Sequence, residues 1–303
     1  MYKELPVWRS LMYVPVNVEK YVDKAHTRGA DVIQLDIEDS VPPAEKANAR
    51  KLVEKNAARV KRGGADVVVR INQPLGMAVR DIEHSICPDV SGIAVTKASG
   101  VSHVQLLDEM ISELEQKRGM TVGHTRFIVM IETPEAFFRI RDITTASSRI
   151  IACNIGGEDF ALNCNMQPTG EALFYPKQHM IIAANAAGIM PLGFIDSVAT
   201  FGDWEKFRIM VRRSRDFGFM GAGCIHPGQV TIVNEEYKPS AADVEYARKV
   251  IALDKEAAAG GRASFALDGK MIDIPIITRA ERLLKRYDAI IARESRTLAA
   301  MKG

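Results

Sequence analysis

Short apolar runs rich in β-branched residues recur along the chain, and longer segments rich in Ala, Glu, Lys and Arg separate them. Nearly continuous apolar runs of this length are typical of parallel strands that are buried on both faces. Eight such runs occur: Leu11–Val16, Val32–Ile37, Val67–Asn72, Gly92–Thr96, Phe127–Glu132, Ile150–Ile155, Met190–Ile195 and Gly221–Ile225. Segments such as 45–61, 103–117 and 205–217 are predicted to form helices between them.

Strand–helix alternation of this kind favours an α/β fold with a parallel sheet. Eight units favour closure into a (β/α)₈ TIM barrel, which typically takes about 250 residues. The chain has 303 residues, enough for one barrel and an appendage. An open doubly wound sheet is the alternative, but it would carry a glycine-rich fingerprint after the first strand, where this chain reads VPVNVEK. We therefore expect a barrel over residues 1–238.

Residues 239–303 do not continue the strand–helix pattern and are predicted to form a C-terminal helical extension. Ser240 is a candidate N-cap for a helix that ends at Gly260–Gly261. A last helix is expected over Pro275–Met301. A closed barrel has no free edge to extend, so the extension should lie across a barrel mouth or against a neighbouring subunit.

Composition narrows the class of protein. The hydrophobic fraction of 47% and the charged fraction of 26% are ordinary for a soluble globular chain, and the net charge of +2 gives no global field that favours nucleic acid. No apolar stretch reaches the roughly 20 residues of a membrane helix. The four cysteines form neither a CxxC pair nor a zinc-finger spacing with histidine. We expect a cytoplasmic enzyme with neither nucleic-acid nor membrane partners.

Polar residues stand where the predicted strands end, and barrel active sites are built at the carboxyl ends of the strands. Several acidic groups and an arginine would therefore converge on one mouth. Like charges at close range repel, and a bound divalent cation would relieve that repulsion. The strand-end residues are Asp36, Glu38, Asp39, Arg70, Lys97, Glu132, Glu158, Asp159 and His226.

The ligand types at this mouth predict the kind of metal. Carboxylates without a Cys or His cluster favour a hard cation, Mg²⁺ or Mn²⁺. Mg²⁺ takes one or two protein carboxylates and completes its shell with water and substrate oxygens, a count that Glu132 and Asp159 suit. Glycines 156 and 157 precede Glu158 and Asp159. Their backbone could approach a small carboxylate closely, so Gly157 and Glu158 are candidate substrate-binding residues.

Seven motifs in a fixed order cover almost the whole chain. They are Arg9–Ser10, LDIEDSV at 35–41, VVRIN at 68–72, MIETPEAF at 130–137, GGEDFAL at 156–162, IHPGQ at 225–229 and DGKMIDIP at 268–275. In this order they resemble the citrate lyase beta-subunit-like enzymes, which include malyl-CoA and citramalyl-CoA lyases. The resemblance implies a (β/α)₈ barrel that assembles as a homo-oligomer, a trimer or hexamer. In such an assembly the C-terminal segment helps to complete a neighbour's active site.

The resemblance also assigns roles to individual residues. Glu132 and Asp159 match the Mg²⁺ ligands of the family, and Arg70 matches the arginine that faces the reacting oxygens. Positions 36 and 38 match the acidic motif that supports the metal-bound waters, so Asp36 and Glu38 join the catalytic set. The acid/base aspartate of the C-terminal segment corresponds to Asp273. Positions that bind CoA or line the site in family members correspond to Arg9, Lys46 and Lys97.

The predicted activity is a reversible Claisen-type cleavage. A 3-hydroxy-3-carboxyacyl-CoA such as malyl-CoA, citramalyl-CoA or citryl-CoA would yield an acyl-CoA and a 2-oxoacid, with coenzyme A as part of the substrate. The alternatives are a thioesterase on the same esters, the beta subunit of a multi-protein citrate lyase, and a metal-dependent aldolase for free oxoacids. The sequence does not identify the acyl group, because one methylene changes pocket affinity by only about 1–3 kcal/mol.

Overall fold

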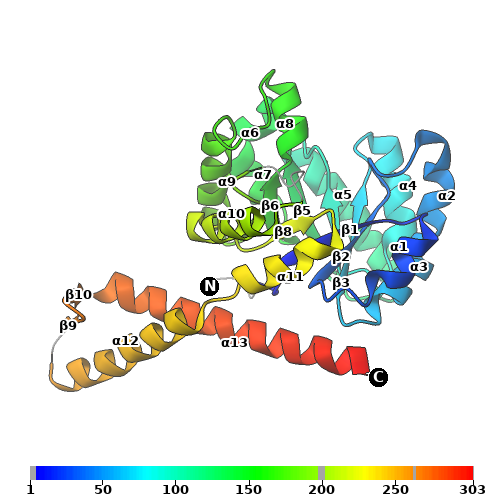
Figure 1. The fold of residues 1–303 in the computed structure, drawn as a ribbon. Helices are drawn as coiled ribbons and strands as arrows, with labels where there is room; N and C mark the ends of the chain where they lie inside the picture. The colour runs from blue at the N-terminus through cyan, green and yellow to red at the C-terminus, as the bar shows by residue number, and fades with distance from the viewer. Residues whose placement is uncertain (1–4, 197–201, 262–263, 303) are drawn as a thin grey trace. The chain divides into compact units, whose positions relative to one another are not determined.

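The computed structural model describes residues 5–196, 202–261 and 264–302 (Figure 1). The chain divides into two compact units: the second spans Lys238–Ala299, and the first comprises the residues up to Tyr237 together with those from Ala300 onward. Within the described ranges, none of the helices combines the length and apolar content that a membrane crossing requires.

The first unit contains one eight-stranded sheet. Its strands are β1 (Ser10–Pro15), β2 (Val32–Asp36), β3 (Asp66–Ile71), β4 (Gly92–Val95), β5 (Arg126–Ile131), β6 (Ile150–Ile155), β7 (Met190–Leu192) and β8 (Ala222–Cys224). They lie in the order β7-β6-β5-β4-β3-β2-β1-β8, and neighbours pair in parallel. A parallel bridge between Leu192 and Gly221 joins the two ends. The predicted (β/α)₈ barrel is therefore confirmed.

Helices flank the strands on the outside of this unit (Figure 1). They are α1 (Glu19–Ala25), η1 (Pro43–Glu45), α2 (Lys46–Lys51), α3 (Val53–Lys61), α4 (Leu75–Ser85), α5 (Val101–Lys117), α6 (Pro134–Phe138), α7 (Ile140–Thr144), α8 (Gly157–Asn163), α9 (Phe174–Ala187), α10 (Trp204–Phe217) and α11 (Pro227–Glu236). The helix predicted over 45–61 is interrupted at Leu52, whose N–H bonds to the Ala49 carbonyl in a tighter, 3₁₀-type turn.

Alternation along the strands separates two apolar layers. In β3 and β5, Val68, Ile128 and Met130 belong to the cluster at the centre of the barrel. The residues between them, such as Val69 and Val129, belong to the larger cluster under the helices. Side chains two positions apart share a face of a strand. Arg70 and Glu132 therefore continue the central face at the carboxyl ends of these strands.

The second unit is built from two long helices and a hairpin. Helix α12 (Ala241–Ala259) begins with the predicted N-cap Ser240, whose hydroxyl accepts a hydrogen bond from the Asp243 N–H. Strands β9 (Phe265–Leu267) and β10 (Lys270–Ile272) pair antiparallel. Their turn, Asp268–Gly269, has φ values of 48° and 74°, a pattern that Asp-Gly favours. Helix α13 (Ile274–Lys302) follows, one residue earlier than predicted.

Candidate active site

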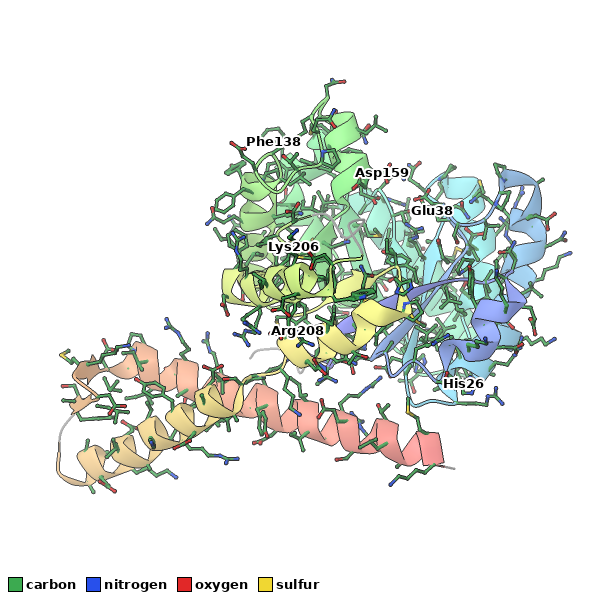
Figure 2. All side chains as sticks on the ribbon, in the orientation of Figure 1. His26, Glu38, Phe138, Asp159, Lys206 and Arg208 are labelled. Carbon is green, nitrogen blue, oxygen red and sulfur yellow. The ribbon has the colours of Figure 1, made fainter. Side chains whose placement is uncertain are left out.

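A cavity of about 950 Å³ lies at the carboxyl ends of the barrel strands. This volume falls within the roughly 300–1,000 Å³ of small-molecule sites. The cavity is lined by six of the predicted site residues: Asp36, Arg70, Glu132, Gly157, Glu158 and Asp159. Figure 2 shows Glu38 and Asp159 at this same end of the barrel. The structure therefore brings most of the predicted residues together.

Arg70 is held in one orientation by carboxylates. Its Nε and Nη2 donate to the two carboxylate oxygens of Asp36 at 2.8 and 2.6 Å. Its Nη1 lies 3.0 Å from Glu38 Oε2 and 3.3 Å from Asp39 Oδ2. Burial alone would raise the pKa of Asp36, but the hydrogen bonds and charge of Arg70 bring that pKa below its usual value. A planar guanidinium fixed by two parallel bonds is a preorganised cation at the cavity wall.

Lys97 joins three of the acidic groups. Its backbone N–H donates to Glu132 Oε2 at 2.6 Å, and its Nζ lies 3.1 Å from Glu38 Oε1 and 3.6 Å from Asp159 Oδ2. Its φ of 47° is unusual for a residue with a side chain. Burial alone would lower the pKa of Lys97, but the nearby carboxylates raise it, Glu132 most strongly. This lysine therefore belongs to the acidic cluster and does not line the cavity.

Glu132 is a buried carboxyl with excess negative charge around it. It is 3% exposed. Burial, reinforced by Asp159 and Glu38 and opposed by Lys97, raises the pKa of Glu132 to about 7. Gly156 makes room for it, because a Cβ at that position would lie 2.3 Å from Glu132 Oε1. A buried carboxyl beside another carboxylate is the electrostatic setting that a bound cation stabilises.

The donor set fits a hard divalent cation. In the described part of the chain, no three His, Cys, Asp or Glu side chains gather as a metal site of their own. Two carboxylates, Glu132 and Asp159, face a roomy cavity, which matches the way that Mg²⁺ is held by few protein oxygens together with water and substrate. The residues present thus fit the predicted Mg²⁺ and leave its remaining positions to the ligand.

The raised pKa of Glu132 leads us to expect that the stability of the protein depends on pH. The raised pKa means that its contribution to stability is fully present below the ordinary value of 4.5 and is lost as the pH rises through about 7. Mg²⁺ at this site would bind the ionised carboxyl and remove this penalty. We expect Mg²⁺ to raise the Tm more at about pH 8 than at about pH 5.5, and Glu132→Gln to abolish the difference. Equal shifts at both pH values in scanning calorimetry would contradict this.

Two residues that were predicted to bind CoA, Arg9 and Lys46, do not line the cavity. Arg9 precedes β1, at the opposite end of the strand from the cavity, and it is 2% exposed. Its guanidinium is paired with Asp31 at 2.8 Å. The Nζ of Lys46 donates to the backbone carbonyls of Ile37 and Glu38, at 3.2 and 2.8 Å, and so fixes the loop after β2. Neither lines the cavity, so we leave both out of the proposed CoA-binding set.

Asp273 belongs to the second unit, between β10 and α13. Its backbone carbonyl accepts hydrogen bonds from the N–H groups of Ile276 and Ile277 in the first turn of α13. An aspartate just before a helix can also serve as its side-chain N-cap. Among the described residues no hydrogen bond to its carboxylate is found, so the carboxylate does not serve as that cap.

The cavity residues that were not predicted include two polar ones, Tyr13 and Lys177. Tyr13 lies under the Arg70 guanidinium, whose Cζ is 4.9 Å from the ring centroid, and burial raises the pKa of its phenol. Gly223 leaves space for this ring, since a Cβ there would lie 2.8 Å from it. Lys177, on α9, is the second. Strand alternation with Leu11 could have indicated Tyr13, whereas no local pattern marks Lys177.

Comparison with known proteins agrees with this architecture. Residues 9–227 match the family model described as HpcH/HpaI aldolase/citrate lyase. The citrate lyase subunit beta of Leuconostoc mesenteroides subsp. cremoris is 32% identical over 285 residues, covering 93% of each chain. The L-malyl-CoA/beta-methylmalyl-CoA lyase of Cereibacter sphaeroides (strain ATCC 17025 / ATH 2.4.3) is 28% identical over 307 residues, covering 94% of this chain and 96% of that enzyme.

Solved structures share the fold. A citrate lyase from Burkholderia xenovorans LB400 superimposes with a TM-score of 0.80 at 17% identity, covering 98% of this chain and 97% of that one. The protein CitE from Mycobacterium tuberculosis, in complex with magnesium, acetoacetate and coenzyme A, gives a TM-score of 0.70 at 23% identity, covering 93% and 98%. The matching family model spans most of the barrel and its site, and the chain belongs to the HpcH/HpaI aldolase/citrate lyase family.

Proposed function

We propose that this protein is a Mg²⁺-dependent carbon–carbon lyase for CoA thioesters. Its substrate is a 3-hydroxy-3-carboxyacyl-CoA, which it cleaves into an acyl-CoA and a 2-oxoacid. The observation that carries the proposal is one cavity lined both by the acidic pair Glu132 and Asp159 and by the fixed guanidinium of Arg70. The names of the relatives, citrate lyase subunit beta and malyl-CoA lyase, support the reaction class. The magnesium and coenzyme A of the M. tuberculosis complex support the cofactor and the ester.

Cleavage places distinct demands on the site. The substrate hydroxyl gives its proton to solvent water, the electron pair of the C2–C3 bond moves onto C2, and C3 becomes the keto carbon of the oxoacid. Glu132 and Asp159 would hold Mg²⁺, and the bound ion would supply Lewis-acid polarisation of the substrate oxygens. The carboxylates of Asp36 and Glu38 keep Arg70 oriented, so that its N–H groups stabilise the negative charge on the enolate oxygen.

The enolate must gain a proton at C2, and we propose that Asp273 supplies it. The family resemblance assigns this role, and a carboxylate that does not cap its own helix is available for it. We further propose a homo-oligomer, a trimer or hexamer, in which Asp273 comes from a neighbouring subunit.

Exposed cations on α1 and in the loop that follows it suit the phosphate end of the CoA. Lys20, Lys24 and Arg28 are exposed and line the cavity, and none of them is an assigned catalytic group. Flexible cations at the outer wall of a cavity can neutralise phosphates without being buried. We therefore propose that these three residues replace Arg9 and Lys46 as the CoA contacts.

Arg70→Lys provides a test of the charge-stabilising role. Lysine keeps the positive charge but loses the planar fork that pairs with Asp36. We expect kcat to fall by at least about 10²-fold, the cost of one preorganised donor, with little change in the affinity for Mg²⁺. Arg80→Lys, on the exposed face of α4, is the matched control. Full kcat in Arg70→Lys would make Arg70 a structural ion-pair residue.

The main alternative within the family is the beta subunit of a multi-protein citrate lyase. The name of the Leuconostoc mesenteroides relative, citrate lyase subunit beta, favours this alternative. Such a subunit would act on a carrier-protein thioester with its partners. The purified chain is therefore assayed alone, with malyl-CoA, citramalyl-CoA and citryl-CoA. Turnover of a CoA ester supports a self-sufficient lyase, whereas turnover only with added partners and a carrier-protein thioester supports the subunit.

A further inference from the structure

Lys177 is a buried lysine in the wall of the active-site cavity, outside the cluster described above. It lies on α9 and is 5% exposed. Its backbone N–H bonds to the carbonyl of Leu173, one helical turn earlier, and both residues line the cavity. Leu173 packs against Gly157, since a Cβ on that glycine would lie 3.1 Å from it. Lys177 thus belongs to the α8–α9 wall that also carries Asp159.

In the described part of the chain, the ammonium of Lys177 has unused hydrogen-bonding capacity. An ammonium has three N–H donors. Among residues 5–196, 202–261 and 264–302, the one acceptor found for Lys177 Nζ is the backbone carbonyl of Asp196, at 3.3 Å. No ion pair within 4.0 Å is found for it in these ranges. By contrast, the buried cations with carboxylate partners at 2.7–2.9 Å include Arg9, Arg50 and Arg149.

A buried cation without a close anion is unfavourable in the free protein and favours the binding of an anion. Burial lowers the pKa of Lys177 to about 8, while the charges of Asp196 and Glu158 oppose the decrease. The ammonium is therefore still mostly protonated at neutral pH. A carboxylate that enters the cavity would accept the free donors and supply the missing charge.

Burial and position narrow the identity of that anion. The phosphates of a CoA ester are bulky and hydrated, and the exposed cations Lys20, Lys24 and Arg28 are available to them. Lys177 is 5% exposed and lies on the wall that carries the proposed metal ligand Asp159, so it suits a small group that enters the cavity. The oxoacid half would lie beside the Mg²⁺ that Glu132 and Asp159 are proposed to hold, so a second carboxylate on that half is the chemistry that fits.

We propose that Lys177 is a specificity-determining residue that binds a second carboxylate on the oxoacid half of the substrate. This inference rests on the proposed lyase function and narrows its substrate to the class that releases a dicarboxylic 2-oxoacid. Citryl-CoA and citramalyl-CoA form a matched pair for the test, because they differ in a single group, –CH₂COO⁻ in place of –CH₃. Both release acetyl-CoA, one with oxaloacetate and the other with pyruvate.

The experiment compares kcat/KM for the two esters in wild type, Lys177→Met and Lys177→Arg, with Lys51→Met on the exposed end of α2 as control. We expect wild type to prefer citryl-CoA by at least about 30-fold, the effect of one buried charge pair. Lys177→Met should lose that preference by lowering kcat/KM for citryl-CoA and changing that for citramalyl-CoA by less than about threefold. Lys177→Arg should retain part of the preference.

A binding measurement provides a readout that does not depend on turnover. Freshly dissolved oxaloacetate should raise the Tm of wild type with Mg²⁺ more than pyruvate does, and Lys177→Met should remove the excess. Equal losses for both esters, or wild type without a preference for citryl-CoA, would overturn the role of Lys177 and leave the lyase function intact. The preference of wild type can be measured without any variant, so its absence would overturn the role of Lys177 even if Lys177→Met fails to fold. Wild type that cleaves malyl-CoA but neither of these two esters would overturn this inference alone, whereas wild type that cleaves none of the three would overturn the proposed function as well.

Discussion

Glu132→Gln is expected to lower kcat for thioester cleavage by at least about 10³-fold, because the loss of one of two protein ligands removes most of the Lewis-acid stabilisation, worth several kcal/mol. The amide keeps the shape that fits against Gly156 and cannot supply the negative charge. The fold should survive, since burial already disfavours the ionised carboxyl, whose pKa it raises to about 7. Asp159→Asn is expected to act in the same direction.

The control for this substitution lies three residues away. Glu135 is exposed on α6, so Glu135→Gln removes the same charge from the same segment without touching the cavity. Titration calorimetry with Mg²⁺ should show weakened binding in Glu132→Gln and unchanged binding in Glu135→Gln. Near-normal kcat in a well-folded Glu132→Gln variant would remove this carboxylate from the proposed ligand set.

Asp273→Asn is expected to lower both cleavage and α-proton exchange by about 10²–10⁴-fold, the range for the loss of a general acid or base. The amide cannot donate a proton to the enolate carbon or remove one. Mg²⁺ binding should be unchanged, because the proposed metal ligands Glu132 and Asp159 lie in the barrel. Asp268→Asn is a close control, since asparagine tolerates the positive φ of 48° in the hairpin turn. Retained proton exchange in Asp273→Asn would assign the acid to another residue.

Mixed oligomers test whether the sites are shared between subunits. Protomers with Asp273→Asn and protomers with Glu132→Gln are both expected to be inactive alone. In a mixed assembly, an intact barrel can meet an intact C-terminal segment, and part of the activity should return. If subunit exchange is shown by mass spectrometry and no activity returns, the proposal of shared sites is wrong.

The strands could be predicted because burial on both faces leaves a nearly continuous apolar run in the sequence. The predicted ends of the strands were less accurate. The seventh run was expected to reach Ile195, but β7 ends at Leu192. Gly193 follows with a φ of 142°, and a Cβ there would lie 2.9 Å from Phe219. That backbone turn depends on a distant side chain and has no local signal.

Some cavity residues could be predicted from the sequence and others could not. Asp36, Arg70 and Glu132 could be predicted because strand alternation and barrel geometry direct them to one mouth. Lys177 could not, because it comes from a helix and reaches the cavity only through the packing of α9 against α8. Arg9 matches a family motif, yet it precedes β1 and pairs with Asp31, which precedes β2. Both residues therefore lie at the amino ends of the strands, away from the cavity.

The most direct test of the central claim is the identity of the products that the purified chain forms from citryl-CoA, with and without Mg²⁺. The account predicts acetyl-CoA and oxaloacetate in equal amounts, formed only with the metal, as resolved by liquid chromatography and mass spectrometry. Free CoA and citrate would instead identify a thioesterase, and equal cleavage in the presence of a chelator would contradict the role of the metal.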